Sequence, residues 1–136
     1  MATIEAPPCA EFLHSELLEL AEGRAVVRFR PTAQMTNSFG FIQGGILAAM
    51  LDNVAAPAIL SAAEGQQTST MQMSVNYFRP VRPGEVLIGM TDDVRLGRIS
   101  AYAEVHLERE SDKALVCKAI YSNVLQAPPS PPQGVQ

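Results

Sequence analysis

The fold of this chain is decided by one stretch of its sequence, Asn37-Ser-Phe-Gly-Phe-Ile-Gln-Gly-Gly-Ile-Leu-Ala-Ala-Met-Leu-Asp-Asn-Val-Ala-Ala-Pro-Ala-Ile-Leu60. It opens with a glycine-rich turn, and between Gly45 and Leu60 its only ionisable side chain is Asp52. Those sixteen residues are too few for a typical membrane-spanning helix. We therefore predict a helix from about Gln43 to Ala62, buried in the core of a soluble protein.

Asp52 lies in a stripe of small residues on one side of the predicted helix. At helical spacing this side carries Gly45, Ala48, Ala49, Asp52, Ala55, Ala56 and Ile59. A lone carboxylate in an apolar helix is costly unless it is hydrogen-bonded or protonated, and such buried acids are often catalytic. The alternative is a helix that ends early and leaves Asp52 exposed, which Asn53 and Pro57 would allow. In a continuous helix, Pro57 predicts a kink or break.

The start of the same helix could bind an anion. The first amides of a helix have no internal partner and carry the positive end of its dipole. Because Gly44 has no Cβ, a substrate carbonyl could approach its N–H, which would make an oxyanion-binding arrangement. The alternative is that Gly44 and Gly45 only form a tight turn against a sheet.

These residues together resemble the thioesterase superfamily with the hot-dog fold. More narrowly, they resemble its phenylacetyl-CoA and small acyl-CoA thioesterase branch. The family signature reads Asn-x-x-Gly-x-x-His-Gly-Gly with an acid nine residues after the His, and this chain has Asn37, Gly40, Gln43, Gly44, Gly45 and Asp52 at those positions. Gln43 thus replaces the usual His. The similarity continues through Asn76-Tyr77-Phe78-Arg79-Pro80, and the strand pattern covers about residues 24 to 125.

The resemblance implies a fold and an activity. The fold would be α+β, a hot-dog fold in which an antiparallel sheet of five or six strands wraps around one long central helix, plus an N-terminal helix. The activity would be hydrolysis of an acyl-CoA or aryl-CoA thioester, with the oxyanion on the Gly44 amide and Asp52 either activating water or attacking directly. Asn37 would help to bind the oxyanion or fix its own loop. Thr70 would position the attacking water or the Asp52 carboxylate, unless it is only a β-branched residue typical of a strand. Gln43 would take the structural role of the usual His.

The spacing of Gly44 and Asp52 predicts a site shared between subunits. Eight residues of straight helix separate them, or about 12 Å, so one carbonyl cannot meet both groups on the same helix. The family is similar in forming its sites between two subunits. We therefore expect a two-fold homo-oligomer, at least a dimer, and we favour a tetramer, although the sequence does not separate the two.

Further residues are expected to bind the substrate, which is the acyl-CoA itself. Because coenzyme A carries phosphates, basic residues should lie at the mouth of the site, although arginines in turns are often only solvated. The expected set is Gly45, Phe39, Arg79, Arg82 and Arg98, with Arg95 as a further candidate. An apolar pocket is suggested by Met35, Phe39, Phe41, Met71, Met73 and Met90, which core packing explains equally well.

Composition narrows the remaining possibilities. The chain has 136 residues and a net charge of 10 − 14 = −4, so we expect a single domain over residues 1–126, a disordered Pro-rich tail over 127–136, and no binding to nucleic acid or membrane. Two cysteines and two histidines without ligand spacing predict no metal and no disulfide framework. We expect no cofactor, since coenzyme A is part of the substrate. The first 20 residues do not resemble a signal peptide, which predicts a cytoplasmic protein.

Periodicity predicts the remaining elements. We expect an amphipathic helix over Cys9–Glu22, with His14 beside its apolar face, and strands over residues 24–30, 68–78, 85–95, 99–108 and 114–125. His106 falls on a polar phase and is expected to be solvated. Two other functions remain open. One is a non-catalytic acyl-CoA-binding or sensing module of the same fold, and the other is a hot-dog hydratase, which would need a His beside an acid in the site.

Overall fold

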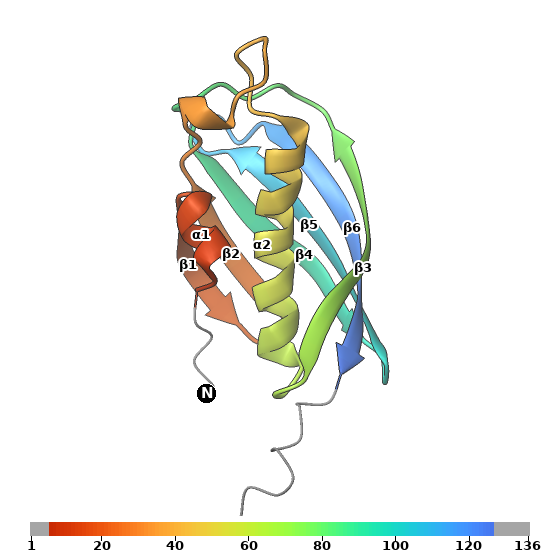
Figure 1. Cartoon of the computed structure of the whole chain (residues 1–136). Helices are drawn as coiled ribbons and strands as arrows, with labels where there is room; N and C mark the ends of the chain where they lie inside the picture. Colours follow the sequence, from red (N-terminus) through yellow and green to blue (C-terminus); the bar gives the residue numbers. More distant parts are fainter. Residues whose placement is uncertain (1–5, 127–136) are drawn as a thin grey trace, which may run out of the picture.

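A six-stranded antiparallel sheet curls around one long helix (Figure 1). The computed structural model describes residues 6–126, so the predicted tail over 127–136 lies outside the described residues. The elements are α1 (Pro8–Phe12), β1 (Ser15–Ala21), β2 (Arg24–Phe29), η1 (Ala33–Met35), α2 (Gly44–Ala62), β3 (Gln67–Tyr77), β4 (Leu87–Leu96), β5 (Ser100–Arg109) and β6 (Leu115–Gln126). The strand order β1-β2-β4-β5-β6-β3 leaves β1 and β3 at the edges. The predicted hot-dog fold is confirmed.

The helix α2 packs its branched and large side chains against the sheet. Its buried residues are Leu47, Met50, Leu51, Val54, Ala55, Ala58 and Ile59. The break expected at Pro57 does not occur, since α2 continues for 19 residues through that position. Burial of Val54, Ala58 and Ile59 around the proline outweighs the one lost backbone hydrogen bond. The length and hydropathy of α2 would suit a membrane-spanning segment, but its buried face makes it the core helix of this fold.

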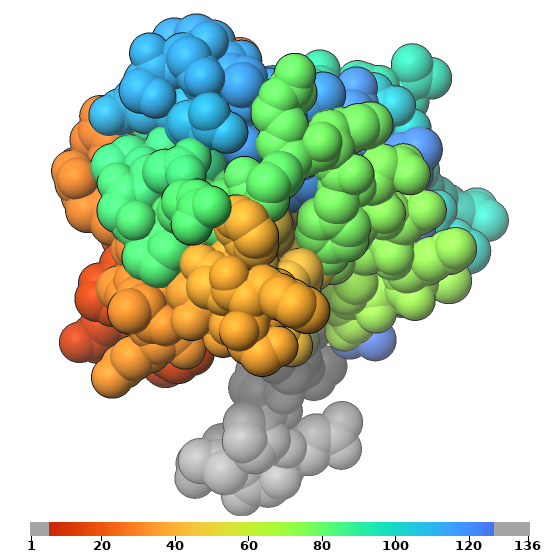
Figure 2. All heavy atoms as spheres, turned by 90° about the horizontal axis from the view of Figure 1, so that it is seen from above, coloured from red at the N-terminus to blue at the C-terminus, as the bar shows by residue number. Residues whose placement is uncertain are grey.

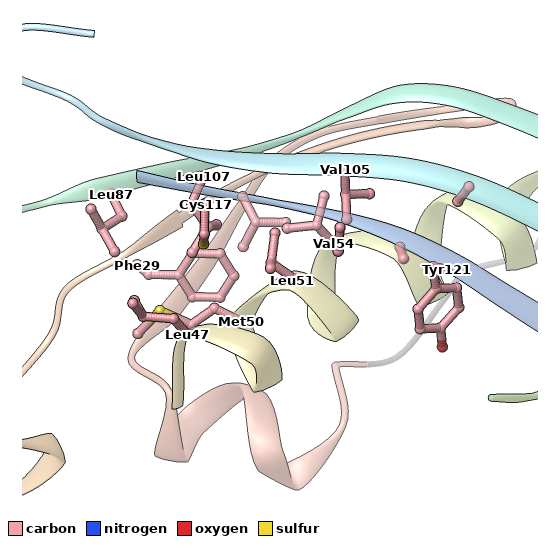
Figure 3. Close-up of a cluster of buried hydrophobic side chains, with 14 of the residues drawn as sticks. Phe29, Leu47, Met50, Leu51, Val54, Leu87, Val105, Leu107, Cys117 and Tyr121 are labelled. Carbon is pink, nitrogen blue, oxygen red and sulfur yellow. The ribbon is translucent and has the colours of Figure 1, made fainter. Parts of the chain in front are cut away.

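Gly89 allows α2 to approach the sheet closely. It lies in β4, and a Cβ built there would be 2.4 Å from Cγ2 of Val54 and 3.0 Å from Cδ2 of Leu107. No side chain fits in that space. The core around this contact includes Phe29, Leu51, Leu87, Leu107 and Val105, all fully buried and gathered between helix and sheet in Figure 3. The helix that carries Gly44 and Asp52 is therefore held rigidly.

The N-terminal region differs from the sequence-based prediction. The helix ends at Phe12 instead of continuing to Glu22, and residues 15–21 form β1, which pairs with β2. Gly23, with φ of 75°, makes the tight turn of this β1–β2 hairpin and does not end a helix. The predicted helix was wrong because the spacing of Leu17 and Leu20 is also compatible with a helix. In the structure these residues belong to a strand that contains a bulge at Leu18, between Leu17 and Glu19.

Candidate active site

The loop before α2 is fixed by backbone groups and by Asn37. The Asn37 Oδ1 accepts from the N–H of Phe39 at 2.9 Å and from that of Phe41 at 3.2 Å. The N–H of Ile42 donates to the Val81 carbonyl at 2.8 Å, which ties this loop to the segment after β3. Figure 2 looks down on this end, where the orange loop lies against the green segment. Asn37 therefore fixes its loop through Oδ1, while its Nδ2 has no acceptor among residues 6–126.

The start of α2 presents free amides. Within the described residues, no acceptor faces the N–H of Gly44 or Gly45, and both belong to the first turn of α2. The Tyr77 hydroxyl donates to the Gly44 carbonyl at 2.7 Å, and a Cβ at Gly44 would lie 3.4 Å from the Tyr77 ring. Burial is the larger cause that raises the pKa of Tyr77, so the phenol stays a donor. Tyr77 thus anchors the helix start, and its exposed ring borders the space over Gly44.

Gln43 precedes the helix, but its side chain supports nothing in residues 6–126. It occupies the N-cap position with an exposed side chain that makes no capping hydrogen bond. The backbone of Gln43 makes the hydrogen bonds that hold this part of the loop. Its N–H donates to the Met35 carbonyl at 2.9 Å, and its carbonyl accepts from the N–H groups of Ile46 and Leu47. The loop geometry therefore does not depend on which side chain stands at position 43.

Further along α2, Asp52 lies near a partly buried group of polar side chains on β3 and β6. Its side chain is half-buried, and its buried Oδ1 has no hydrogen-bond donor among the described residues. The Thr70 Oγ1 lies 2.5 Å from the Tyr121 hydroxyl, and the neighbouring Asp52 is one of the groups that raise the pKa of that hydroxyl. Asn123, fully buried, lies two residues along β6 from Tyr121. A bulge at Met71, between Thr70 and Gln72, sets the register that turns Thr70 toward α2.

The surroundings of Tyr121 favour the neutral, protonated form of its phenol. Burial, the largest cause, together with the neighbouring Asp52, raises the pKa of Tyr121 from 10.0 to about 12, while Thr70 and Asn123 act in the opposite direction. In Figure 3 the Tyr121 hydroxyl points away from the apolar cluster. The protonated phenol can donate a hydrogen bond, and a carboxylate can only accept one.

The expected substrate-binding residues divide between the two ends of α2. Phe39 is 82% exposed in the loop before α2. Arg82 stacks over the Phe41 ring, with 4.7 Å from its guanidinium carbon to the ring centroid, and Arg79 donates to the Leu115 carbonyl at 2.7 Å. These three lie at the Gly44 end. Arg98 follows β4 in a turn beside the other end of α2 (Figure 1), so within one chain it does not join them.

The other candidates do not gather into one site. Met35 is buried in the core, Met73 packs against it, and Met71 is 64% exposed on β3. Arg95 is exposed and pairs with Asp93 at 2.9 Å. The methionines therefore do not line one pocket.

Neither histidine belongs to the helix side of the sheet. His106 lies on β5 and is not solvated as predicted, because its Nδ1 lies 2.8 Å from an Asp92 carboxylate oxygen and its Nε2 3.3 Å from Glu108. The His106 side chain points away from α2, because its neighbours on β5, Val105 and Leu107, face the core. His14 lies in the turn after α1 with φ of 51°. A hydratase-like His–acid pair therefore does not face Asp52.

Three residues of the site escape sequence reasoning. These are Tyr77 on β3 and Tyr121 and Asn123 on β6. The alternation along a strand predicts which face of the sheet a residue lies on, but it does not predict a role in a site. One signal is available: Tyr121 and Asn123 are polar residues at consecutive core-facing positions of β6, where Cys117, Ala119 and Leu125 are apolar. A polar pair in an apolar phase indicates a polar partner across the core.

The chain is similar in sequence to known thioesterases and esterases. Residues 39–116, more than half of the chain, match the sequence profile of the thioesterase superfamily. Human acyl-coenzyme A thioesterase 13 is 23% identical over 109 residues, covering 80% of this chain and 78% of the human protein. A putative esterase of Saccharolobus solfataricus is 27% identical over 113 residues, covering 82% of this chain and 79% of that protein.

Solved structures agree on the fold. The PaaI protein of E. coli, from the phenylacetic acid degradation operon, superposes with a TM-score of 0.83 at 24% identity, covering 90% of this chain and 86% of that one. A Thermus thermophilus protein superposes with a TM-score of 0.79 at 29% identity, covering 88% and 98%. The prediction of a thioesterase is confirmed, and the chain belongs to the thioesterase superfamily.

Proposed function

We propose that this chain hydrolyses acyl-CoA thioesters at a site formed between two copies, with Gly44 supplied by one copy and Asp52 by the other. The substrate class is supported by similarity to proteins named acyl-coenzyme A thioesterase. The observation that carries the shared site is the position of both groups on one uninterrupted helix. Eight residues of that helix separate them by about 12 Å, which is too far for one thioester carbonyl to meet both.

The Gly44 amide would bind the oxyanion that develops during attack. It has no acceptor within residues 6–126 and stands at the positive end of a 19-residue helix. Such preorganised donors are among the largest contributors to acyl-transfer catalysis. The Asn37 side chain belongs to the adjoining loop and keeps its Nδ2 available as a second donor.

The surface of the chain is suited to a partner that supplies the acid. The residues of α2 that are not buried include Gly45, Ala48, Ala49 and Ala56 around Asp52, and so small a stripe lets another backbone approach closely. The strand β3 is also an edge of the sheet, 11 residues long, with unpaired backbone groups. An edge of this kind favours pairing with a second copy. A two-fold dimer with two equal sites follows, and two dimers could join as a tetramer.

The remaining residues would have supporting roles. Asp52 would either activate a water molecule or attack the thioester carbonyl itself, and Thr70 would act close to Asp52. Arg79 and Arg82 at the Gly44 end carry charge that suits the phosphates of coenzyme A. A CoA-binding or sensing module without catalysis is the alternative function.

The test is hydrolysis of a panel of short, medium and aryl acyl-CoAs, followed with a dye that reacts with the released thiol. We expect turnover by the natural chain and a loss of orders of magnitude in Asp52→Asn. The matched control is Asp93→Asn, which removes a carboxylate that pairs with Arg95 and should retain activity. Binding of the panel without thiol release by the natural chain would favour the sensing module, and normal turnover by Asp52→Asn would remove its proposed role.

A further inference from the structure

We propose that Tyr77 is a positioning residue for the start of α2, and that it acts through the Gly45 N–H, which joins the Gly44 N–H as a further donor to the oxyanion. This inference rests on the proposed function, because it assigns a task in the same thioester hydrolysis. Its geometric basis is one hydrogen bond, in which the Tyr77 hydroxyl donates to the Gly44 carbonyl at 2.7 Å.

The hydrogen bond from Tyr77 acts on the peptide group that joins Gly44 to Gly45. A peptide group is planar, so its carbonyl and its N–H turn together. A donor fixed on the Gly44 carbonyl therefore also fixes the direction of the Gly45 N–H, which has no acceptor among residues 6–126. The same donor polarises the peptide group, which makes the Gly45 N–H a stronger hydrogen-bond donor.

The preceding peptide group is held in the same way. Its carbonyl, that of Gln43, accepts from the N–H groups of Ile46 at 2.9 Å and Leu47 at 3.2 Å, and its other end is the Gly44 N–H. Two consecutive peptide groups are thus held at their carbonyl ends, while their N–H groups have no acceptor in the described part of the chain. Neighbouring amides in the first turn of a helix can bind one anionic atom together.

Tyr77 supplies support that the start of α2 otherwise lacks. Within residues 6–126, no other side chain hydrogen-bonds the backbone of residues 43–46. Gln43 makes no capping hydrogen bond, and the first turn contains no acidic residue. Glycine loses more conformational freedom on folding than any other residue, so a helix that begins with two glycines tends to fray. The Tyr77 hydroxyl opposes that fraying.

The phenol can hold the helix because Tyr77 is itself fixed at the end of β3. Tyr77 pairs with Cys117 of β6, and the N–H of the next residue, Phe78, donates to the Val116 carbonyl at 2.8 Å. The ring lies against the helix start, since a Cβ added to Gly44 would be 3.4 Å from its Cζ. The hydroxyl therefore cannot leave the Gly44 carbonyl without moving the ring from this contact.

The phenol is tested with Tyr77→Phe, which keeps the ring and removes only the hydroxyl. Tyr102→Phe is the matched control, because it also removes a hydrogen-bonded tyrosine hydroxyl, which contacts Glu104 at 2.8 Å on β5. In the thiol-release assay, Tyr77→Phe should lower kcat about tenfold with KM changed less than about twofold, because the phenol acts on a donor to the transition state. Tyr102→Phe should match the natural chain in both.

The route through the Gly45 amide is tested with Gly45→Pro. Proline removes the N–H and is tolerated in the first turn of a helix, and a Cβ at Gly45 would have no neighbour within 4 Å. This variant should lower kcat about 100-fold, and Gly45→Ala, which keeps the N–H, should lower it less. In the Gly45→Pro background, Tyr77→Phe should cause no further loss, because the N–H through which the phenol acts is gone.

Hydrogen exchange tests the anchoring without any turnover. The N–H groups of Ile46 and Leu47 are the first hydrogen-bonded amides of α2, so fraying of the first turn exposes them. They should exchange about tenfold faster in Tyr77→Phe than in the natural chain, and at the natural rate in Tyr102→Phe. Should Gly45→Pro fail to fold, this exchange and the kcat of Tyr77→Phe carry the test.

The inference is overturned by an unchanged kcat in a folded Tyr77→Phe, by an effect on KM alone, or by effects of Tyr77→Phe and Gly45→Pro that simply multiply. A loss of kcat without faster exchange at Ile46 and Leu47 would also overturn it, since the phenol would then not hold the helix start. An inactive natural chain is a failure of the proposed function, and the exchange measurement still tests the anchor separately.

Discussion

Replacement of Gly44 by proline should remove the oxyanion donor while leaving the fold intact. Proline has no N–H and is tolerated at the first position of a helix, where Gly44 lies. The preceding residue must be extended, and Gln43 already has φ of −63° and ψ of 140°. The added Cβ would contact the Tyr77 ring at 3.4 Å without a clash, and the lost N–H has no acceptor in residues 6–126.

The expected effect is therefore kinetic. Loss of one oxyanion donor costs about 100-fold to 1,000-fold in kcat, whereas the melting temperature should change by only a few degrees. Gly44→Ala is the comparison, because it adds the same Cβ but keeps the N–H; it measures how far the Cβ alone hinders the substrate carbonyl, and it should lower kcat less than Gly44→Pro does. Thiol release at saturating acyl-CoA measures both. A Gly44→Pro variant with more than a third of natural kcat, or a Gly44→Ala variant that is equally impaired, would refute the role of this amide.

Three further predictions concern packing, pH and the departure from the family signature. Gly89→Ala should lose about 1–3 kcal/mol of unfolding free energy in urea, because its Cβ would lie 2.4 Å from Val54, whereas Gly45→Ala has open space and should not. Burial raises the pKa of Cys117 from 9.0 to about 12. The folded chain therefore keeps this proton where the unfolded chain loses it, and stability should fall above about pH 9, by up to about 1.4 kcal/mol per pH unit. Urea titrations of Cys117→Val should lack the part of this fall between about pH 9 and pH 10, because above that range the raised pKa of Tyr121 lowers stability in the same way. Gln43→His should keep its thiol-release rate, since the side chain at 43 caps nothing, and a loss of tenfold or more would contradict this.

Much of the fold could be predicted because its signals are local. The apolar run after Gly44 predicted α2 to within one residue at its start, and clean alternation predicted β3 to β6. The strand β1 was missed because its identity depends on pairing with β2 and on a bulge at Leu18, which no local pattern reveals. The requirement for glycine at position 89 was missed for a related reason. It arises because Val54, on a distant segment of the chain, occupies the space that a side chain would need.

The candidate site divides in the same way. Asn37, Gly44 and Asp52 were identified from their spacing within one stretch. Tyr77 and Tyr121 were not, because each meets its partner across more than 30 residues of chain. The expected position of Arg98 depended on where the turn after β4 falls, and that turn lies beside the far end of α2.

The decisive measurement is recovery of activity by mixing two inactive variants. Gly44→Pro and Asp52→Asn chains are unfolded and refolded together, and thiol release is compared with that of each variant refolded alone. If one copy supplies the amide and the other supplies the acid, each mixed dimer contains one intact site, and random pairing restores about one quarter of the natural activity. If the mixture forms mixed oligomers and remains as inactive as its components, both groups act within one chain and the shared site is wrong.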